Sequence, residues 1–443
     1  MIKRAKDRGL AAWPPRLSPF GLALGGLTVF AFAIRLFYAL EVAPGQIQPG
    51  DSHVYRELAD ALANSGAYNL EGLLHRDAPT ASHPPLYSLY LAAFTKLGLA
   101  SFSAHRAVSC LLGAAAVWLI GLLGRRVAGP RVGLVAAALA AVYPQLFMVD
   151  GTVIAESLYA PLLVMTLLLA YHFLDSPSAA RAAALGATIG LATLTRSDGI
   201  LLLVVLAIPL AWRAGRGRLQ LLAVIFAVTA LVLSPWLVRN WVRFDRFPLL
   251  SSNGALTQLA TNCPATYYGD RVGFVAHDCA LRSRCLRIRD EIPQSECLLR
   301  EARGYVRHHL SRLPVVALAR LGRLWNVYAP GDDRAYGQLW ARERTLATIG
   351  MVMYAVLAVL AIGGALLLRR RGVPLLPLLA SLVLAMLVAL IAFGFSRYRL
   401  AAEPALVVFA AVSLQALAVR TRRALERRSA PVVGKASRPA RTS

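Results

Sequence analysis

The sequence predicts an all-α integral membrane protein. Of its 443 residues, 57% are hydrophobic and 16% are charged, and the mean hydropathy of +0.55 is too high for an ordinary soluble domain. The apolar residues form separate segments, most of them near the ~20 residues that a helix needs to cross a bilayer. The basic residues lie mainly in alternate connections between these segments, as in multispanning proteins.

Ten segments are predicted to span the membrane. The first, 18–40, follows the basic stretch 1–17 and is longer than the core of a signal peptide, so we expect it to be retained. The other nine are 108–124, 132–149, 153–174, 179–195, 199–212, 219–238, 346–368, 373–395 and 400–419. Two further segments, 86–99 and 313–328, are predicted to lie at the interface, because the first is too short to cross and the second mixes basic and aromatic residues.

The charge distribution predicts which ends of the spans face the cytoplasm. The net charge is +25. With the N-terminus inside, the short outer turns contain only Arg196, Arg397 and Arg399. The short inner connections contain Arg125, Arg126, Arg131, Arg181, Arg213, Arg216, Arg218, Arg369, Arg370 and Arg371. This satisfies the positive-inside rule. Because the basic residues lie between apolar segments, we expect no nucleic-acid binding.

The same topology predicts five regions and a compartment for the cysteines. The regions are a cytoplasmic basic N-terminus 1–17, a transmembrane core 18–239, an extracytoplasmic region 240–345, C-terminal transmembrane helices 346–419 and a cytoplasmic basic tail 420–443. Four of the five cysteines lie in the extracytoplasmic region: Cys263, Cys279, Cys285 and Cys297. Two disulfides are expected there, with three pairings open. A zinc site is less favoured because no Cys-x-x-Cys pair is present.

Several charged residues are predicted to meet at the outer ends of the spans. They are Asp51 after the first span, Glu156 at the start of the fourth, Arg196 and Asp198 after the fifth, and Arg397 and Arg399 after the ninth. Ionisable residues near membrane depth usually face a cavity and a partner, although each of these also suits an ordinary loop. Carboxylates can take a proton from an acceptor, and arginines bind phosphate with paired hydrogen bonds. Arg35, inside the first span, is expected either to anchor the helix end or to pair with a carboxylate.

The order of several motifs resembles a known family. The motifs are Asp51-Ser52-His53-Val54-Tyr55, His83-Pro84-Pro85-Leu86-Tyr87, Glu156-Ser157-Leu158, Gly190-Leu191-Ala192-Thr193-Leu194-Thr195-Arg196 and Ser396-Arg397-Tyr398-Arg399. Together they resemble the polyprenyl-phosphate-dependent GT-C glycosyltransferases of the family-39 type, which include the protein O-mannosyltransferases and the aminoarabinose transferases of lipid A. The resemblance covers residues 20–240 well and 310–420 loosely.

The resemblance implies a GT-C fold in which two helices of the first outer loop, 54–65 and 86–99, lie along the membrane. It implies that Asp51 is the catalytic base or orients the acceptor, and that Glu156 is the second acidic residue of the site. The residues expected to bind substrate are Tyr55, His83, Arg196, Arg397 and Arg399. His83 replaces a lysine of the aminoarabinose branch, and Ser52 replaces a glutamate of the protein mannosyltransferases, so the acceptor class stays open.

The sequence therefore predicts a multi-pass glycosyltransferase of the plasma membrane with an extracytoplasmic active site. It would transfer a sugar, with inversion, from a polyprenyl-phosphate donor to a lipid, glycan or protein acceptor. The alternatives are a transporter or flippase of lipid-linked sugars, and a glycan polymerase or ligase that uses diphosphate donors. Since no P-loop, dinucleotide loop or His-rich motif is present, we expect no nucleotide or redox cofactor. A divalent metal bound by Asp51 and Glu156 is left open.

Overall fold

The computed structural model describes residues 18–48, 50–70, 78–215, 217–245, 250–340 and 342–428. Within them the chain is almost wholly helical, and one small antiparallel sheet pairs β1 (Asn69–Leu70) with β2 (Ala78–Pro79). The predicted N-terminal stretch 1–17, Arg216 and the tail from residue 429 lie outside these ranges.

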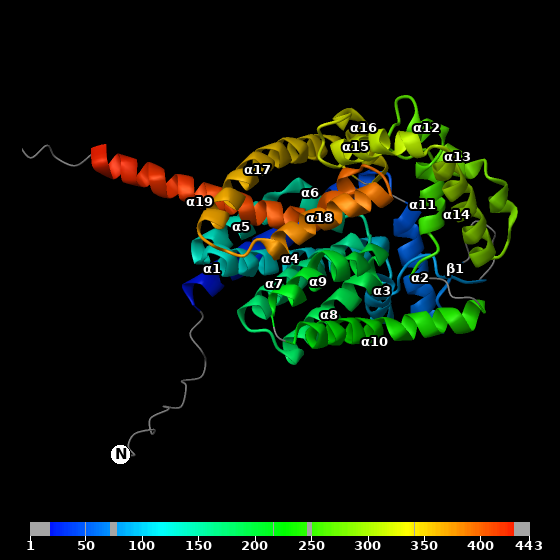
Figure 1. Cartoon of the computed structure of the whole chain (residues 1–443), viewed down its shortest axis with the longest axis horizontal. Coiled ribbons are helices and arrows are strands. Elements are labelled where there is room, and N and C mark those ends of the chain that lie inside the picture. The colour runs from blue at the N-terminus through cyan, green and yellow to red at the C-terminus, as the bar shows by residue number, and fades with distance from the viewer. Residues whose placement is uncertain are drawn as a thin grey trace, which may run out of the picture.

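Long apolar helices form a bundle in which their axes run in broadly similar directions (Figure 1). Six described helices are long and apolar enough to cross a membrane: α1 (Pro19–Phe37, with its continuation to Gly45), α4 (Phe102–Ala128), α7 (Glu156–Asp175), α10 (Arg218–Phe244), α17 (Arg344–Arg370) and α19 (Glu403–Arg428). A seventh span is formed if α5 (Pro130–Val142) and α6 (Pro144–Asp150), which meet at a bend of 58°, are counted together. Pro144 explains the bend, because proline disfavours helical geometry in the residue before it.

Ten spans were predicted, but only six or seven of the described segments are long enough as helices to cross a membrane. Two predicted spans are the shorter apolar helices α8 (Ala179–Thr195) and α18 (Leu376–Ile391). A third, 199–212, is divided into the 3₁₀ helix η3 (Ser197–Leu201), the π-helix η4 (Leu203–Ala207) and α9 (Ile208–Arg213). The difference arises because a hydropathy pattern records apolar residues and does not record whether the helix is continuous.

Two helices of the loop that follows α1 and precedes α4 in the chain, α2 (Gly50–Ser65) and α3 (Leu86–Lys96), pack against each other. Helices were predicted at 54–65 and 86–99, but α2 begins earlier, so Asp51 lies in its first turn and not in a preceding loop. The partial positive charge of a helix N-terminus favours a carboxylate there.

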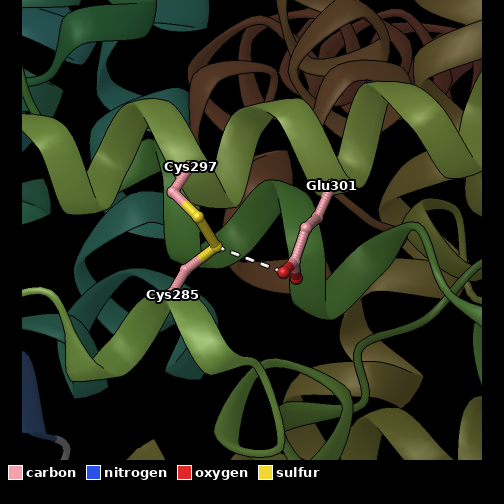
Figure 2. A group of neighbouring side chains, drawn as sticks. All are labelled: Cys285, Cys297 and Glu301. Carbon is pink, nitrogen blue, oxygen red and sulfur yellow. Dashed lines mark hydrogen bonds between the residues drawn. A yellow bond between two sulfur atoms is a disulfide. The ribbon is translucent and has the colours of Figure 1, made fainter.

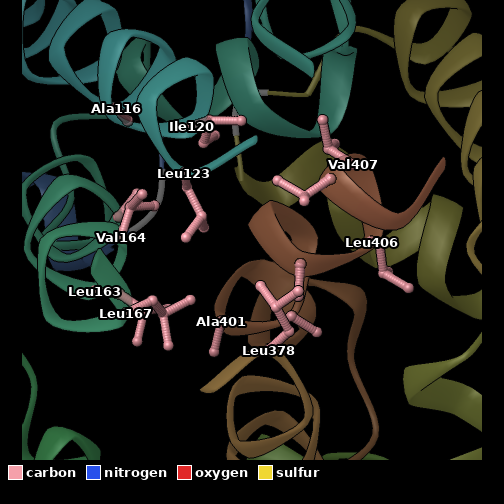
Figure 3. Packing of buried hydrophobic residues seen from close by; sticks show 14 of the residues in the cluster. Ala116, Ile120, Leu123, Leu163, Val164, Leu167, Leu378, Ala401, Leu406 and Val407 are labelled. Carbon is pink, nitrogen blue, oxygen red and sulfur yellow. The ribbon is translucent and has the colours of Figure 1, made fainter. Parts of the chain in front are cut away.

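The core of the bundle is filled by aliphatic side chains from several helices, among them α4, α7, α18 and α19 (Figure 3). Small residues let helices approach closely. A Cβ on Gly186 of α8 would lie 2.5 Å from the backbone oxygen of Ile225 in α10. Such contacts are typical of helix packing in membranes.

Residues 250–340 form a layer of short helices at one end of the bundle (Figure 1), which we call the end layer. Its helices are α11 (Gly254–Thr261), α12 (Pro264–Tyr267), α13 (His277–Leu281), α14 (Glu291–His308), α15 (Leu313–Leu324) and α16 (Pro330–Gly337). Arg320 of α15 is buried and donates hydrogen bonds to the backbone oxygens of Leu390 and Thr261, at 2.6 and 2.8 Å. The predicted segment 313–328 thus contains a helix whose arginine joins the end layer to the bundle.

Two disulfides lie within the end layer and select one of the three pairings left open by the sequence. They join Cys263 to Cys279 and Cys285 to Cys297. Figure 2 shows Glu301 beside the second disulfide, with its Oε1 atom 3.2 Å from the Sγ atom of Cys285. These three residues have the atoms of a metal site, but the disulfide uses both thiols, so the zinc alternative is not supported.

A buried ion pair joins α1 to α6. Arg35 Nε lies 3.0 Å from Asp150 Oδ2, and the two side chains are 1% and 2% exposed. Arg35 also donates to the backbone oxygens of Ala140 and Ala141. Gly113 of α4 leaves room for the pair, since a Cβ there would lie 1.9 Å from Asp150 Oδ2. Arg35 therefore pairs with a carboxylate and does not anchor the helix end.

Replacing Asp150 should destabilise the bundle strongly. Asp150→Asn leaves the Arg35 charge buried without an anion, which costs about 3–5 kcal/mol in the free energy of unfolding. The matched control is Asp175→Asn, because Asp175 pairs with Arg126 on the surface and such pairs contribute about 1 kcal/mol or less. Unfolding of both variants in detergent micelles measures the difference. An equal free energy of unfolding for the two variants would contradict a stabilising contribution from the buried pair.

The cysteine pairing can be tested directly. Peptide mapping without reduction should recover the Cys263–Cys279 and Cys285–Cys297 crosslinks and a free thiol at Cys110. Replacing Cys285 and Cys297 together by serine should reduce the stability of the end layer by about 3 kcal/mol, because it reopens a short loop in the unfolded state. Recovery of a disulfide that joins a cysteine of one pair to a cysteine of the other would overturn this arrangement.

Candidate active site

Charged residues from four distant segments meet where the bundle contacts the end layer. Arg397, in the 3₁₀ helix η8 (Ser396–Ala401), lies between two carboxylates. Its NH1 and NH2 atoms are 3.1 and 3.2 Å from Asp51 Oδ2, and its Nε donates to Glu156 Oε1. Arg196, just after α8, pairs with Glu156 and, at 3.1 Å, with Asp198. The structure thus brings together the carboxylates and two of the arginines predicted from the topology.

The two carboxylates differ in access to solvent. The side chain of Asp51 is 26% exposed, whereas those of Arg397 and Glu156 are 10% and 2% exposed. A group that takes a proton from a substrate must reach it within hydrogen-bond distance. The geometry therefore favours Asp51 for contact with substrate and Glu156 for holding the arginines.

Both arginines are held in their charged form. Burial disfavours the charge of Arg397, but the carboxylates of Glu156 and Asp51 outweigh burial and raise its pKa above the ordinary value. Burial is likewise outweighed at Arg196 by Asp198 and Glu156, which raise its pKa. The site consequently presents permanent positive charge next to Asp51.

His83 lies beside Asp51 but carries no charge near neutral pH. Its Nε2 atom is 3.8 Å from Asp51 Oδ1 and 3.2 Å from the side-chain amide of Asn253. Burial lowers the pKa of His83, and the opposing effect of Asp51 does not restore it. His83 is therefore a neutral hydrogen-bonding group. The ring of Tyr55 packs against it, 4.8 Å away between centroids.

Arg399 does not join this group. It pairs with Glu403 at 2.6 Å, donates to the backbone oxygen of Leu324 and stacks 3.5 Å from the ring centroid of Tyr354. Residues two positions apart in a 3₁₀ helix point in different directions, so Arg397 and Arg399 face different partners.

Two neighbours of the site were not found from the sequence. The ring centroid of Trp340 lies 3.9 Å from Arg397 Cζ, a cation–π contact, and Asn253 contacts His83. Both belong to the hydrophilic segment 240–345, where no periodic pattern indicated which side chains turn toward the bundle.

The carboxylates do not fit a divalent cation between them. The Arg397 guanidinium already bridges Asp51 and Glu156, so a positive group occupies that position. Behind them lies a small cavity of about 20 Å³, lined in part by Glu156, Ser157, Asp150 and Arg35. In the described part of the chain, Glu156 Oε2 has no hydrogen-bond partner.

Part of the chain matches a known protein family. Residues 82–239 match the family described as dolichyl-phosphate-mannose-protein mannosyltransferase. The segment contains His83, Glu156 and Arg196, so the resemblance predicted from the sequence is confirmed there. No curated protein matches the sequence.

Two solved archaeal structures share the fold. The oligosaccharyltransferase of Archaeoglobus fulgidus in its apo form superimposes with a TM-score of 0.52 and 18% identity, over 94% of this chain and 52% of that one. The same organism's AglB, in complex with an inhibitory peptide and a dolichol-phosphate, gives 0.50 and 16% over 95% and 52%. ArnT from Cupriavidus metallidurans, bound to undecaprenyl phosphate, gives 0.43 and 16% over 94% and 82%. The chain thus spans about half the length of the archaeal enzymes.

The neutral state of His83 predicts a change in stability with pH. Above its ordinary pKa near 6.5, His83 is neutral both folded and unfolded, and pH has no effect through it. As the pH falls below 6.5, the unfolded chain takes up the proton more readily, so the folded state loses stability. His83→Asn should therefore reduce the fall in melting temperature between pH 7 and pH 5. An identical fall in wild type and variant would contradict the lowered pKa.

Proposed function

We propose that the protein is a membrane glycosyltransferase that transfers a sugar from a polyprenyl-phosphate donor to an acceptor hydroxyl, with inversion at the anomeric carbon. The family match over residues 82–239 supports the donor class. The observation that carries the proposal is the bridge of Arg397 between the accessible Asp51 and the buried Glu156. The acceptor is a lipid, glycan or protein on the same side of the membrane.

In the proposed step, Asp51 accepts the proton of the acceptor hydroxyl. The acceptor oxygen forms a bond to the anomeric carbon from the face opposite the phosphate. The bond between that carbon and the phosphate oxygen breaks, and polyprenyl phosphate leaves with the electron pair. No general acid is needed, because phosphate leaves as an anion.

Arg397 can bind both the base, Asp51, and the departing phosphate. While Asp51 is ionised, the NH1 and NH2 groups of Arg397 are directed at it. When Asp51 becomes protonated its negative charge disappears, and one negative charge is added to the departing phosphate. The same guanidinium groups can then bind the phosphate with paired hydrogen bonds, while Glu156 continues to hold the Nε of Arg397.

The other predicted residues have supporting roles in this proposal. Arg196 holds Glu156 and adds positive charge for the donor phosphate. His83 and Tyr55 shape the wall beside Asp51. Arg399 fixes η8 through its buried pair with Glu403, so it acts on substrate only by positioning Arg397.

We propose further that α8, α18 and the segment 199–212 also cross the membrane, which gives ten spans. In this topology the protein lies in the plasma membrane and Asp51 lies outside the cytoplasm. Packing of α8 against both α7 and α10 supports this, because α8 then lies inside the bundle. The two disulfides of the end layer support the sidedness, since disulfides persist in oxidising compartments.

The base can be tested with a matched pair of variants on one helix. Asp51→Asn should reduce the transfer rate by about 10² or more, the usual contribution of a positioned base. Asp60→Asn, on the same helix and paired with Arg56, should transfer at the wild-type rate. The assay uses purified protein in lipid nanodiscs, labelled polyprenyl-monophosphate sugar and an extract of cell-envelope acceptors.

The same assay separates the alternatives. A transporter or flippase would leave all label on the lipid, and a polymerase or ligase would use labelled diphosphate donors in preference to monophosphate donors. Either outcome, or wild-type transfer by Asp51→Asn, would overturn the proposed reaction.

A further inference from the structure

A second cavity lies in the end layer, between α11 and α14. Its volume is about 550 Å³, which is within the range of sites that hold small molecules. Its polar lining residues include Ser251, Ser252, Ser295, Glu296, Arg300 and Arg303.

The wall of this cavity offers hydrogen-bond acceptors. Ser251 Oγ donates its proton to the backbone oxygen of Ser82, and Ser252 Oγ donates to Glu291 Oε1 at 2.5 Å. Ser295 Oγ donates to the backbone oxygen of Ser252 at 3.2 Å. Because each hydroxyl proton is already directed into the protein, each oxygen keeps a lone pair for a donor such as a sugar hydroxyl.

Arg300 and Arg303 of α14 also line the cavity, together with the carboxylate of Glu296 on the same helix. Arg300 and Arg303 are three residues apart on α14, so they project on the same side of that helix. Both side chains are exposed and both line the cavity. Within the described ranges of the chain, neither forms an ion pair. Guanidinium groups of this kind bind phosphate or carboxylate oxygens.

Backbone hydrogen bonds join the serine wall of the cavity to the segment that precedes His83. The backbone N–H of Ser252 donates to the oxygen of Ala81 at 2.9 Å, and that of Asn253 donates to the oxygen of Ser82 at 3.3 Å. Asn253 contacts His83, and His83 lies beside Asp51. Two residues therefore connect the wall of the cavity to the proposed base.

We propose that this cavity binds the acceptor, and that the acceptor carries a hydroxyl-rich sugar with a phosphate or carboxylate group. The hydroxyls bind the serine oxygens, the anion binds Arg300 and Arg303, and a neighbouring hydroxyl reaches Asp51. This assignment rests on the proposed glycosyl transfer for its use of Asp51. The binding of an anionic sugar can be measured without any transfer.

The test is a binding titration of full-length protein in phosphatidylcholine nanodiscs. The probe is glucose 6-phosphate, compared with glucose and with inorganic phosphate. Wild type should bind the sugar phosphate more tightly than either component, and the double variant Arg300→Ala/Arg303→Ala should bind it at least about tenfold more weakly. Arg307→Ala is the matched control, because Arg307 is exposed on α14 but does not line the cavity.

The outcomes are distinct. Absence of binding by wild type, or equal binding by wild type and the double variant, would overturn the site. A tenfold loss confined to the double variant supports it. In nanodiscs that contain phosphatidylglycerol, weaker probe binding by wild type alone assigns the anion to a lipid headgroup, and unchanged binding excludes that source. The titration uses no donor and involves no transfer, so failure of the transfer reaction leaves this measurement interpretable.

Discussion

The structure of the site depends on one guanidinium that is shared by two carboxylates. Arg397 comes from the turn between α18 and α19, Asp51 from α2 and Glu156 from the start of α7. A buried charge that loses its partner is strongly destabilising, so these three segments are held at fixed relative positions. Trp340 covers the guanidinium from the end layer, which limits the directions from which a ligand can approach it.

The end layer also holds the backbone that precedes Arg397. The backbone N–H of Ser396, the neighbour of Arg397, donates to Asp333 Oδ1 at 2.8 Å. The backbone N–H of Gly394 donates to the oxygen of Gly273 at 2.9 Å. Because the layer binds the backbone on the N-terminal side of Arg397, a shift of the layer would move the guanidinium relative to Asp51.

Topology made the main charged residues predictable from the sequence. Residues at the same end of successive spans lie at one depth, so the charge pattern alone placed Asp51, Glu156, Arg196 and Arg397 together. The pattern could not separate Arg397 from Arg399, because that depends on the direction of side chains within a short 3₁₀ helix.

Other features depended on contacts between distant segments. Asp150 lies in the short connection between the predicted spans 132–149 and 153–174, and its pairing with Arg35 requires the close approach that Gly113 permits. Apolar composition also predicted a continuous span at 199–212, where the helix is interrupted; Pro209, which lacks a backbone N–H, lies at the start of α9.

The network also explains why the two carboxylates cannot exchange roles. Protonating Glu156 would leave two buried guanidiniums, those of Arg196 and Arg397, without the anion that they share. Protonating Asp51 leaves Arg397 paired with Glu156 and Arg196 paired with both Glu156 and Asp198. Loss of charge at Asp51 therefore disrupts fewer ion pairs, and Asp51 is also the more accessible carboxylate. Charge pairing and access thus favour the same residue as the proposed proton acceptor.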